Sequence, residues 1–205
     1  KYQKLKNIKI INQTNKGFSG ARNRGLEMIN SRYIMFLDSD DYLCENAIQN
    51  LIKEADNSNA DIVEGGYNII ENEIISTSYQ HKNNTKNHLY GYPWGKIFNN
   101  MLFSRIHFPE FYWFEDTILC LIIYSMTNKI SYINEIVYNY RINPQGITQK
   151  SIGNVKNLDS FYITKKLLQD RKKLNLSFDV DFLKAVISQI VVNFRRLKTI
   201  NNSEI

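Results

Sequence analysis

The chain contains a short apolar run that ends abruptly in three carboxylates. Residues 33–41 read YIMFLDSDD, and the β-branched and aromatic character of the first five residues predicts a buried strand. Asp38, Asp40 and Asp41 would then lie at the carboxyl end of that strand, the edge at which open α/β sheets place ligands. Carboxylates this close repel one another unless a cation or hydrogen-bond donors compensate. The commonest compensation is a hard divalent ion shared with substrate phosphates, so the motif predicts a ligand site.

The spacing of the aspartates argues against simpler explanations. Asp41 is placed to cap a following helix, but capping needs one side-chain oxygen rather than three carboxylates. A calcium loop of the EF-hand kind has Gly at its sixth position and Glu at its twelfth, where this chain has Leu43 and Gln49. Phosphatases of the haloacid dehalogenase class have Thr or Val at the fifth position of their motif, where Tyr42 stands. A metal–diphosphate site fits best.

Size and composition are those of an ordinary globular domain. The 205 residues correspond to one domain, or one domain with an appendage. No apolar run approaches the roughly 18 residues of a membrane-spanning helix, and the first residues lack the pattern of a signal peptide. Cys44 and Cys120 lie far apart without metal-ligand spacing. We therefore expect isolated buried thiols and a cytoplasmic location.

The net charge of +6 is spread along the chain rather than concentrated, and only the last third has dense basic clusters. They comprise Lys165, Lys166, Arg171, Lys172, Lys173, Arg195, Arg196 and Lys198. Solvated helix faces explain such clusters more often than partners do. Peripheral contact with anionic lipid at the inner face of the membrane is the better minority interpretation. Nucleic-acid binding is the weakest one, and we expect no nucleic-acid partner.

Alternating strand and helix patterns predict an α/β sheet with covering helices. The expected strands are 6–12, 33–37, 60–67 and 129–141, and the expected helices are 19–30, 45–55 and 117–125. The inward positions expected in the first two helices are Ala21, Leu26, Ile29, Ala47, Ile48, Leu51 and Ile52. Gly65 and Gly66 predict a bulge or a close backbone approach. The polar stretch 71–88 predicts a loop.

The residues after a turn at 143–146 are predicted to be helical. One apolar face gathers Val155, Leu158, Phe161 and Leu168, and a second gathers Phe182, Val186, Ile190, Phe194 and Leu197. We place a soft boundary at 150 to 155, giving a core of residues 1–150 and a C-terminal helical extension of residues 151–205. The pattern fits packing on the core, formation of a homo-oligomer and membrane contact alike.

A second acidic pair, Glu115 and Asp116, follows an aromatic segment and stands at an expected helix start. Favourable charge at the positive end of a helix, worth roughly 0.3–1 kcal/mol, is the simpler explanation. A carboxylate beside Trp113 and Phe114 is also desolvated, however, and the raised pKa that results is what a general base needs. The segment 94–96, Trp-Gly-Lys, is weak evidence when it is taken alone.

Five segments occur in the order found in family 2 glycosyltransferases of GT-A fold. They are GFSGARNRGLE, YIMFLDSDDYL, YPWGKIF, FPEFYWFEDTIL and YNYRINPQGIT. The chain resembles a bacterial member of this family that builds a surface or capsular polysaccharide. The resemblance implies a GT-A (nucleotide-diphospho-sugar transferase) type mixed sheet with flanking helices. It also implies metal-dependent, inverting transfer of a sugar from a nucleotide-diphosphate donor, most simply a UDP-sugar, to a saccharide or lipid-linked acceptor.

The resemblance implies roles for single residues as well. Asp38 and Asp40 would bind the donor through Mn²⁺ or Mg²⁺, with Asp40 the more direct ligand. Asp116 would deprotonate the acceptor hydroxyl, and Glu115 would orient it or contact the acceptor. Donor contacts are implied for Asn15, Gly17, Arg22, Asn23 and Arg141, and acceptor or sugar contacts for Trp94 and Lys96.

The chain departs from the family pattern at its start. Family members begin with a strand and a Pro-x-Tyr-Asn-like turn, and a second strand then ends in an Asp-Asp-Gly-Ser segment that holds the nucleoside. Neither segment occurs here, so we expect the first strands of the fold to be missing and one sheet edge to be unpaired. We therefore expect this chain alone to bind donor poorly. The alternative function is a catalytically silent binding or assembly module.

Overall fold

The structure is a computed structural model that describes residues 6–81, 89–146, 150–151 and 153–200. Its helices are α1 Gly17–Leu26, α2 Ala47–Ser58, α3 Thr117–Leu121, α5 Asp159–Lys173 and α6 Val180–Leu197. Its strands are β1 Tyr33–Met35, β2 Tyr42–Leu43, β3 Ile62–Glu71, β4 Ile74–Tyr79, β5 Lys96–Asn99 and β6 Ile130–Arg141. Short 3₁₀ turns lie at Asn100–Phe103, Ile123–Met126 and Val155–Leu158.

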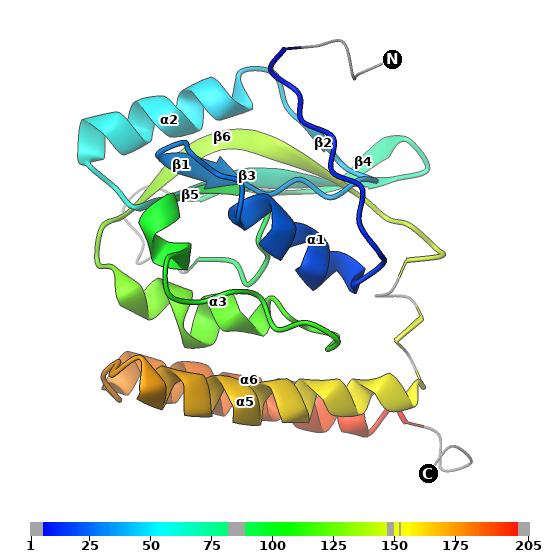
Figure 1. The fold of residues 1–205 in the computed structure, drawn as a ribbon. Helices are drawn as coiled ribbons and strands as arrows, with labels where there is room; N and C mark the ends of the chain where they lie inside the picture. Colours follow the sequence, from blue (N-terminus) through cyan, green and yellow to red (C-terminus); the bar gives the residue numbers. More distant parts are fainter. Residues whose placement is uncertain (1–5, 82–88, 147–149, 152, 201–205) are drawn as a thin grey trace.

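A mixed sheet forms the centre of the molecule. Its strand order is β1-β5-β3-β6-β2, with β4 paired to part of β3. The β3–β6 pair is parallel, and the other described pairs are antiparallel. Helix α2 covers one face, whereas α1 and α3 lie on the other, with α5 and α6 forming a further layer beyond α3 (Figure 1). The predicted α/β class is confirmed.

The core is divided by the sheet into two clusters. In the cluster between the sheet and α2, this helix contributes Ala47, Leu51 and Ala55, which repeat every four residues and therefore lie on one face. On the opposite side, Ile118 and Leu121 of α3 pack with Ile163 and Leu167 of α5. The C-terminal helices thus share the core of the sheet domain, while the predicted boundary at 150 to 155 stays a prediction.

The glycine pair in β3 behaves as predicted. The register of the β3–β6 pairing shifts on both sides of Gly66. A Cβ atom at Gly66 would lie 2.4 Å from the carbonyl oxygen of Tyr79, which is closer than any side chain tolerates. The prediction of a bulge with a close backbone approach is therefore confirmed.

Two predictions are wrong, namely the strand at residues 6–12 and the loop at residues 74–79. Residues 8–16 have no regular secondary structure, and Ile10 is half exposed; no described strand pairs with this segment, and a strand needs a neighbour to complete its hydrogen bonds. Within the expected loop 71–88, β4 forms a hairpin with β3, while residues 82–88 lie outside the described part. Asn72 and Glu73 adopt the positive φ values, 50° and 64°, that a two-residue hairpin turn requires.

Several helix predictions need correction as well. Helix α1 buries Ser19, Gly20 and Asn23 rather than Ala21, which is exposed. In α2 the buried stripe is narrower than expected, leaving Ile48 and Ile52 exposed. Helix α3 ends at Leu121, and the predicted continuation to residue 125 is a 3₁₀ turn.

The apolar faces expected for the last two helices are only partly inward. Val155, in the 3₁₀ turn before α5, is exposed. Phe161 is exposed because α5 turns Ser160, Ile163, Thr164, Leu167 and Arg171 inward instead. In α6, Phe182 is buried, but Ile190 and Phe194 face solvent. Polar side chains occupy the α5–α6 contact, where the Asn193 amide and the Thr164 hydroxyl are joined by a hydrogen bond of 3.0 Å. A prediction based only on the spacing of apolar residues does not detect a contact face made of polar side chains.

Two predictions from composition can be compared directly with the structure. No helix in the described part of the chain is both long and apolar enough to cross a membrane. Cys44 and Cys120 are free thiols, as predicted, and both are partly rather than fully buried.

Candidate active site

The three aspartates after β1 point toward three different partners. Asp38 accepts a hydrogen bond from Arg22 at 2.9 Å. Asp41 is buried, and accepts hydrogen bonds from the Tyr138 hydroxyl and the Arg141 backbone N–H, both at 2.8 Å. Asp40 accepts one from the exposed Asn143 side chain at 3.1 Å. Only Asp38 and Asp40 therefore keep carboxylate surface for a ligand.

The positions of these carboxylates are fixed by β1 and β6. Phe36, directly after β1, is buried edge-on against Phe98, Phe103 and Phe108. The Tyr138 hydroxyl of β6 accepts from the Asp38 backbone N–H at 3.2 Å while it donates to Asp41. Phe36 thus anchors this segment in the core. Asp41, the buried aspartate of the motif, connects the segment to β6 through its hydrogen bond with Tyr138.

Glu115 and Asp116 stand immediately before α3. Asp116 is the N-cap of this helix, so the predicted position at a helix start is confirmed. Phe111 and Phe114 have φ values of 70° and 64°, a region that costs a bulky residue on the order of 1–3 kcal/mol. Glu115 is buried, whereas Asp116 keeps some exposed surface. Asp116 is therefore the more accessible carboxylate of the pair.

Arg22 of α1 joins the two acidic groups. Its guanidinium donates to Asp38 and forms a second ion pair with Glu115. The side chain is only 12% exposed, and its guanidinium lies 5.8 and 5.5 Å from the ring centres of Phe18 and Phe108. One arginine thus brings together residues that are 77 positions apart in the sequence.

The environment raises the proton affinity of the acidic pair. Burial, with the neighbouring Asp116 charge, raises the pKa of Glu115 to about 7, although Arg22 opposes the shift. Burial also raises the pKa of Asp116, opposed by the charges of Arg196 and Arg22. Groups whose pKa is shifted toward neutrality suit proton transfer at neutral pH.

The raised pKa makes a prediction about stability. Because the pKa of Glu115 is about 7 in the folded protein and ordinarily 4.5, its contribution favours folding below pH 4.5 and is lost as the pH rises through 7. Between pH 4.5 and 8 the free energy of unfolding of the wild type should fall by about 3 kcal/mol relative to Glu115→Gln. Urea denaturation across this range measures the difference. Glu27→Gln, at the exposed residue that follows α1, should follow the wild type. Parallel pH dependences of the wild type and Glu115→Gln would contradict the prediction.

Arg196 of α6 is a part of the site that sequence reasoning missed. Its guanidinium lies 3.5 Å from the ring centre of Phe114 and donates to the Ser160 hydroxyl at 2.7 Å. Its positive charge opposes the rise in the pKa of Asp116. The sequence shows Arg196 only as one member of a basic cluster, and nothing there distinguishes it from its solvated neighbour Arg195.

The other predicted donor contacts divide into two groups. Arg141 lies beside the motif, where its Nε donates to the backbone carbonyl of Asp40. Asn23 instead exchanges two hydrogen bonds of 2.8 Å with the backbone of Phe108. Asn15 accepts from the Gly17 N–H at 2.8 Å at the exposed start of α1. The structure thus brings Arg22 and Arg141 to the aspartates and shows Asn23 engaged in holding the chain.

A surface hollow of about 240 Å³ lies along the other side of α1. Among the residues that line it are Lys16, Asn23 and Glu110. Neither Asp40 nor Asp116 lines it. The candidate carboxylates therefore lie outside this hollow.

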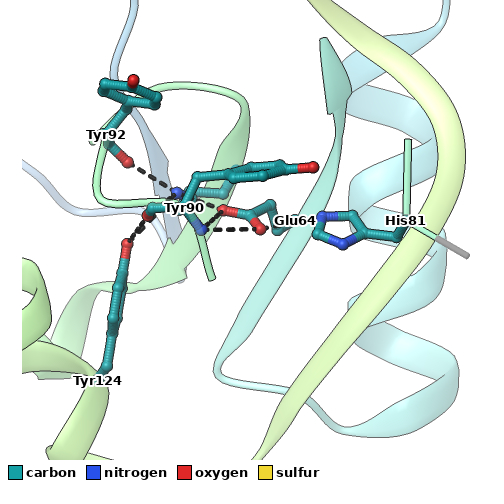
Figure 2. Close-up of polar contacts among 6 residues, drawn as sticks. Glu64, His81, Tyr90, Tyr92 and Tyr124 are labelled. Atoms are coloured by element: carbon teal, nitrogen blue, oxygen red, sulfur yellow. Dashed lines mark hydrogen bonds and ion pairs between the residues drawn. The ribbon is translucent and has the colours of Figure 1, made fainter. Parts of the chain in front are cut away.

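Lys96 belongs to a buried polar cluster. Its side chain is 0% exposed and forms an ion pair with Glu64, while Nζ donates to the carbonyls of Tyr90 and Tyr92 at 2.9 and 2.7 Å. Figure 2 shows Glu64 between Tyr90 and His81, and His81 Nε2 lies 3.0 Å from a Glu64 oxygen. Lys96 thus offers no exposed surface to an acceptor, and its predicted acceptor contact remains untested.

Trp94 is buried in an aromatic stack. Its ring lies 4.6 Å from those of Tyr92 and Tyr138, with nearly parallel planes. Because Tyr138 also holds Asp38 and Asp41, the stack links the segment around residue 94 to the aspartate motif. The predicted contact of Trp94 with acceptor or sugar likewise remains a prediction.

The donor set at the motif fits a divalent cation shared with a ligand. No three His, Cys, Asp or Glu side chains of the described residues converge on one point as a complete metal site. A cation bound together with substrate phosphates needs only one or two carboxylates. Asp38 and Asp40 supply two, both partly exposed. These are hard oxygen ligands, which Mn²⁺ and Mg²⁺ prefer.

Known proteins resemble the chain in sequence and in fold. It is 31% identical over 156 residues to the glycosyltransferase GlyA of Streptococcus pneumoniae serotype 4, covering 66% of this chain and 22% of GlyA. It is 29% identical over 163 residues to the uncharacterized glycosyltransferase EpsJ of Bacillus subtilis, covering 69% of this chain and 47% of EpsJ. TarS of S. aureus, solved in complex with UDP-GlcNAc, superposes with a TM-score of 0.63 at 17% identity, covering 87% of this chain and 55% of that one.

The structural similarity establishes the fold, and the sequence match establishes the family. The likeness to TarS confirms the predicted GT-A type fold. The chain spans about half the length of EpsJ and of the TarS chain, and less of GlyA. Residues 1–114 match the family described as Glycosyl transferase family 2, a match that ends just before Glu115. Because the match covers more than half of its length, the chain belongs to glycosyl transferase family 2.

Proposed function

We propose that the protein is a metal-dependent, inverting glycosyltransferase of the hexosyltransferase class. It moves a sugar from a nucleotide-diphosphate donor to a saccharide or lipid-linked acceptor during synthesis of a surface polysaccharide. The bridge from Asp38 through Arg22 to Glu115 carries the proposal, because it joins a donor-side carboxylate to the residue directly before the proposed base, Asp116. The fold shared with TarS, which was solved with UDP-GlcNAc, supports a UDP-sugar as the donor.

On the donor side, Asp40 and Asp38 would hold Mn²⁺ or Mg²⁺ at the diphosphate. The ion, when bound, neutralises charge on the departing nucleoside diphosphate. Arg141 lies beside Asp40, and its positive charge suits the same anion. Arg22 forms an ion pair with Asp38, so its positive charge offsets part of the negative charge of the motif.

On the acceptor side, Asp116 would accept the proton of the acceptor hydroxyl. The new C–O bond forms as the bond to the diphosphate breaks on the other face of the sugar, so the anomeric centre inverts. The raised pKa of Asp116 makes it a stronger base than an exposed aspartate. Glu115, fixed by Arg22, limits the positions that its neighbour can adopt.

The donor site is tested by Asp40→Ala. With UDP at about a hundred times its dissociation constant and Mn²⁺ present, ligand binding should stabilise the wild type by about 2.7 kcal/mol, or roughly 5–11 °C in Tm. We expect Asp40→Ala to lose this thermal shift, because the cation loses its more direct ligand. Asp56→Ala, on the exposed surface of α2, is the control and should keep it. A full shift in Asp40→Ala would exclude Asp40 as a donor-site ligand.

One observation favours a catalytically silent module as a second candidate. Arg22 occupies both Asp38 and Glu115 in this structure, an arrangement that also suits a purely structural ion-pair network. The two functions are separated by assaying Mn²⁺-dependent sugar transfer and UDP-sugar hydrolysis. Binding of UDP and Mn²⁺ without either reaction would identify the silent module.

We further propose that the protein works in the cytoplasm, at or near the inner face of the membrane. Nucleotide sugars are cytoplasmic metabolites, and a lipid-linked acceptor would be presented at that surface. The strong basic bias of the last third of the chain is consistent with anionic lipid.

A further inference from the structure

Helix α6 carries an apolar stripe that no described element covers. The stripe consists of Leu183, Ile187, Ile190, Val191 and Phe194, whose side chains are 50%, 63%, 43%, 45% and 60% exposed. Their spacing of three, four, seven and eight residues places them on one face of the helix. A different face of α6 packs into the protein through Phe182 and Asn193. Helix α6 is therefore apolar toward solvent as well as toward the core.

The stripe is continuous and lies at one end of the molecule. Figure 1 shows α5 and α6 as the outermost layer, on the side of α3 that faces away from the sheet. Val180, at the first turn of α6, extends the stripe with an exposed fraction of 67%. Single exposed apolar residues are common, but a row along three to four turns of one helix marks an interaction surface.

Basic side chains flank the stripe along one margin and at its C-terminal end, and one of them, Lys184, is paired with the exposed Asp181. Lys184 and Arg195 lie along one margin of it and Lys198 at its end, and all three are exposed. The segment Asp159–Lys198 contains nine Lys and Arg against four Asp residues, a surplus of five out of the net charge of +6 of the whole chain. Arg171 and Arg196 are engaged inside the protein, but the exposed Lys165, Lys172 and Lys173 of α5 add to the positive surface. An occupant that is apolar against the stripe and anionic beside it would match both features.

We propose that α6 docks on an anionic lipid surface, with the stripe among the acyl chains and the flanking Lys and Arg side chains at the phosphates. This is the arrangement by which an amphipathic helix lies in a membrane interface. A second copy of the chain is disfavoured as occupant, because pairing through the stripe would bring two surfaces of the same charge together. Lipid docking requires neither donor nor turnover, so the inference stands independently of the transferase proposal.

The same helix connects the lipid face to the acidic pair. Arg195 points outward beside the stripe, whereas the next residue, Arg196, lies on the ring of Phe114, directly before Glu115. The lipid surface would therefore lie about one helix diameter, ~10–12 Å, from this loop. An acceptor anchored in the membrane would need only a short reach to arrive at Asp116.

Co-sedimentation with vesicles tests the lipid face. We expect the wild type to bind vesicles of 70% phosphatidylcholine and 30% phosphatidylglycerol, and to be released from them by high salt. The double variant Ile187→Asp/Phe194→Asp should bind about tenfold more weakly or less, because acidic side chains oppose insertion. Lys184→Gln/Arg195→Gln should lose the preference for phosphatidylglycerol over pure phosphatidylcholine. Ile74→Asp, at an equally exposed site on β4, is the matched control and should bind like the wild type.

Other outcomes would overturn the proposal. Equal vesicle binding by the wild type and Ile187→Asp/Phe194→Asp would show that the stripe is not inserted. Absence of vesicle binding by the wild type, together with a dimer in light scattering that this double variant dissociates, would assign the stripe to a second copy. Circular dichroism checks that each variant is folded, and UDP binding with Mn²⁺ reports on the donor site separately.

Discussion

Asp116→Asn should lower the rate of sugar transfer by about 10²–10⁴-fold while leaving the affinity for UDP and Mn²⁺ unchanged. An amide has nearly the same shape as the carboxylate but cannot accept the proton of the acceptor hydroxyl, and general base catalysis typically contributes this factor. Donor affinity should be spared, because the predicted donor ligands Asp38 and Asp40 lie on a separate segment. Steady-state kinetics with saturating donor give the turnover, and isothermal titration gives the affinity.

The comparison with an exposed aspartate makes this result specific. Asp181→Asn changes a side chain of α6 that is 91% exposed and should keep wild-type turnover. Full turnover in Asp116→Asn would show that the base has been assigned wrongly. Loss of UDP binding in this variant would place Asp116 on the donor side instead.

The carboxylates of the candidate site could be predicted from sequence because each stands in a recognisable local sequence pattern. One is an aspartate motif after an apolar strand, and the other is an acidic pair after a row of aromatic residues. Both patterns can be recognised within a short stretch of sequence. The predicted positions at a strand end and at a helix start agree with the structure. What each aspartate contacts could not be predicted, since Asp41 is held by Tyr138 and Arg141, about a hundred positions away.

The arginines show why the remainder of the site could not be predicted. Arg22 and Arg196 approach the acidic pair from opposite ends of the chain, and both depend on how α1 and α6 pack. Local sequence gives the type of a helix but not its rotation against its neighbours. The wrongly assigned faces of α5 and α6 have the same origin, because polar residues such as Asn193 and Thr164 fill their contact.

The strand at 74–79 was missed for a different reason. It lies within the stretch 71–88, which is polar as a whole, and all six of its residues are exposed, so burial does not mark it. The signal was the pair Asn72-Glu73, which tolerates the turn with positive φ values. Segment 6–12 is the converse case, with a strand-like composition but no strand beside it in the described structure.

Removing either charge of the buried Glu64–Lys96 pair should destabilise the protein by about 3–5 kcal/mol. Both side chains are at most 1% exposed, and burial lowers the pKa of Lys96 even though Glu64 opposes the shift. In Glu64→Ala, Lys96 would lose its counter-charge, and the Tyr90 N–H would lose its acceptor. For a protein of this size the loss corresponds to roughly 6–20 °C in Tm. Urea denaturation of Glu64→Ala and Lys96→Met measures it.

A double variant separates the cost of an unpaired charge from the value of the pair itself. Glu64→Leu/Lys96→Met removes both charges and fills similar volume, so it should be less destabilised than either single variant. Lys53→Met, at an exposed position of α2, should change the free energy of unfolding by less than about 0.5 kcal/mol. If Lys96 instead contacts the acceptor, Lys96→Met would keep wild-type stability and raise the KM for the acceptor. Stability and KM therefore decide between the structural role that the contacts of Lys96 indicate and the acceptor role implied by the family resemblance.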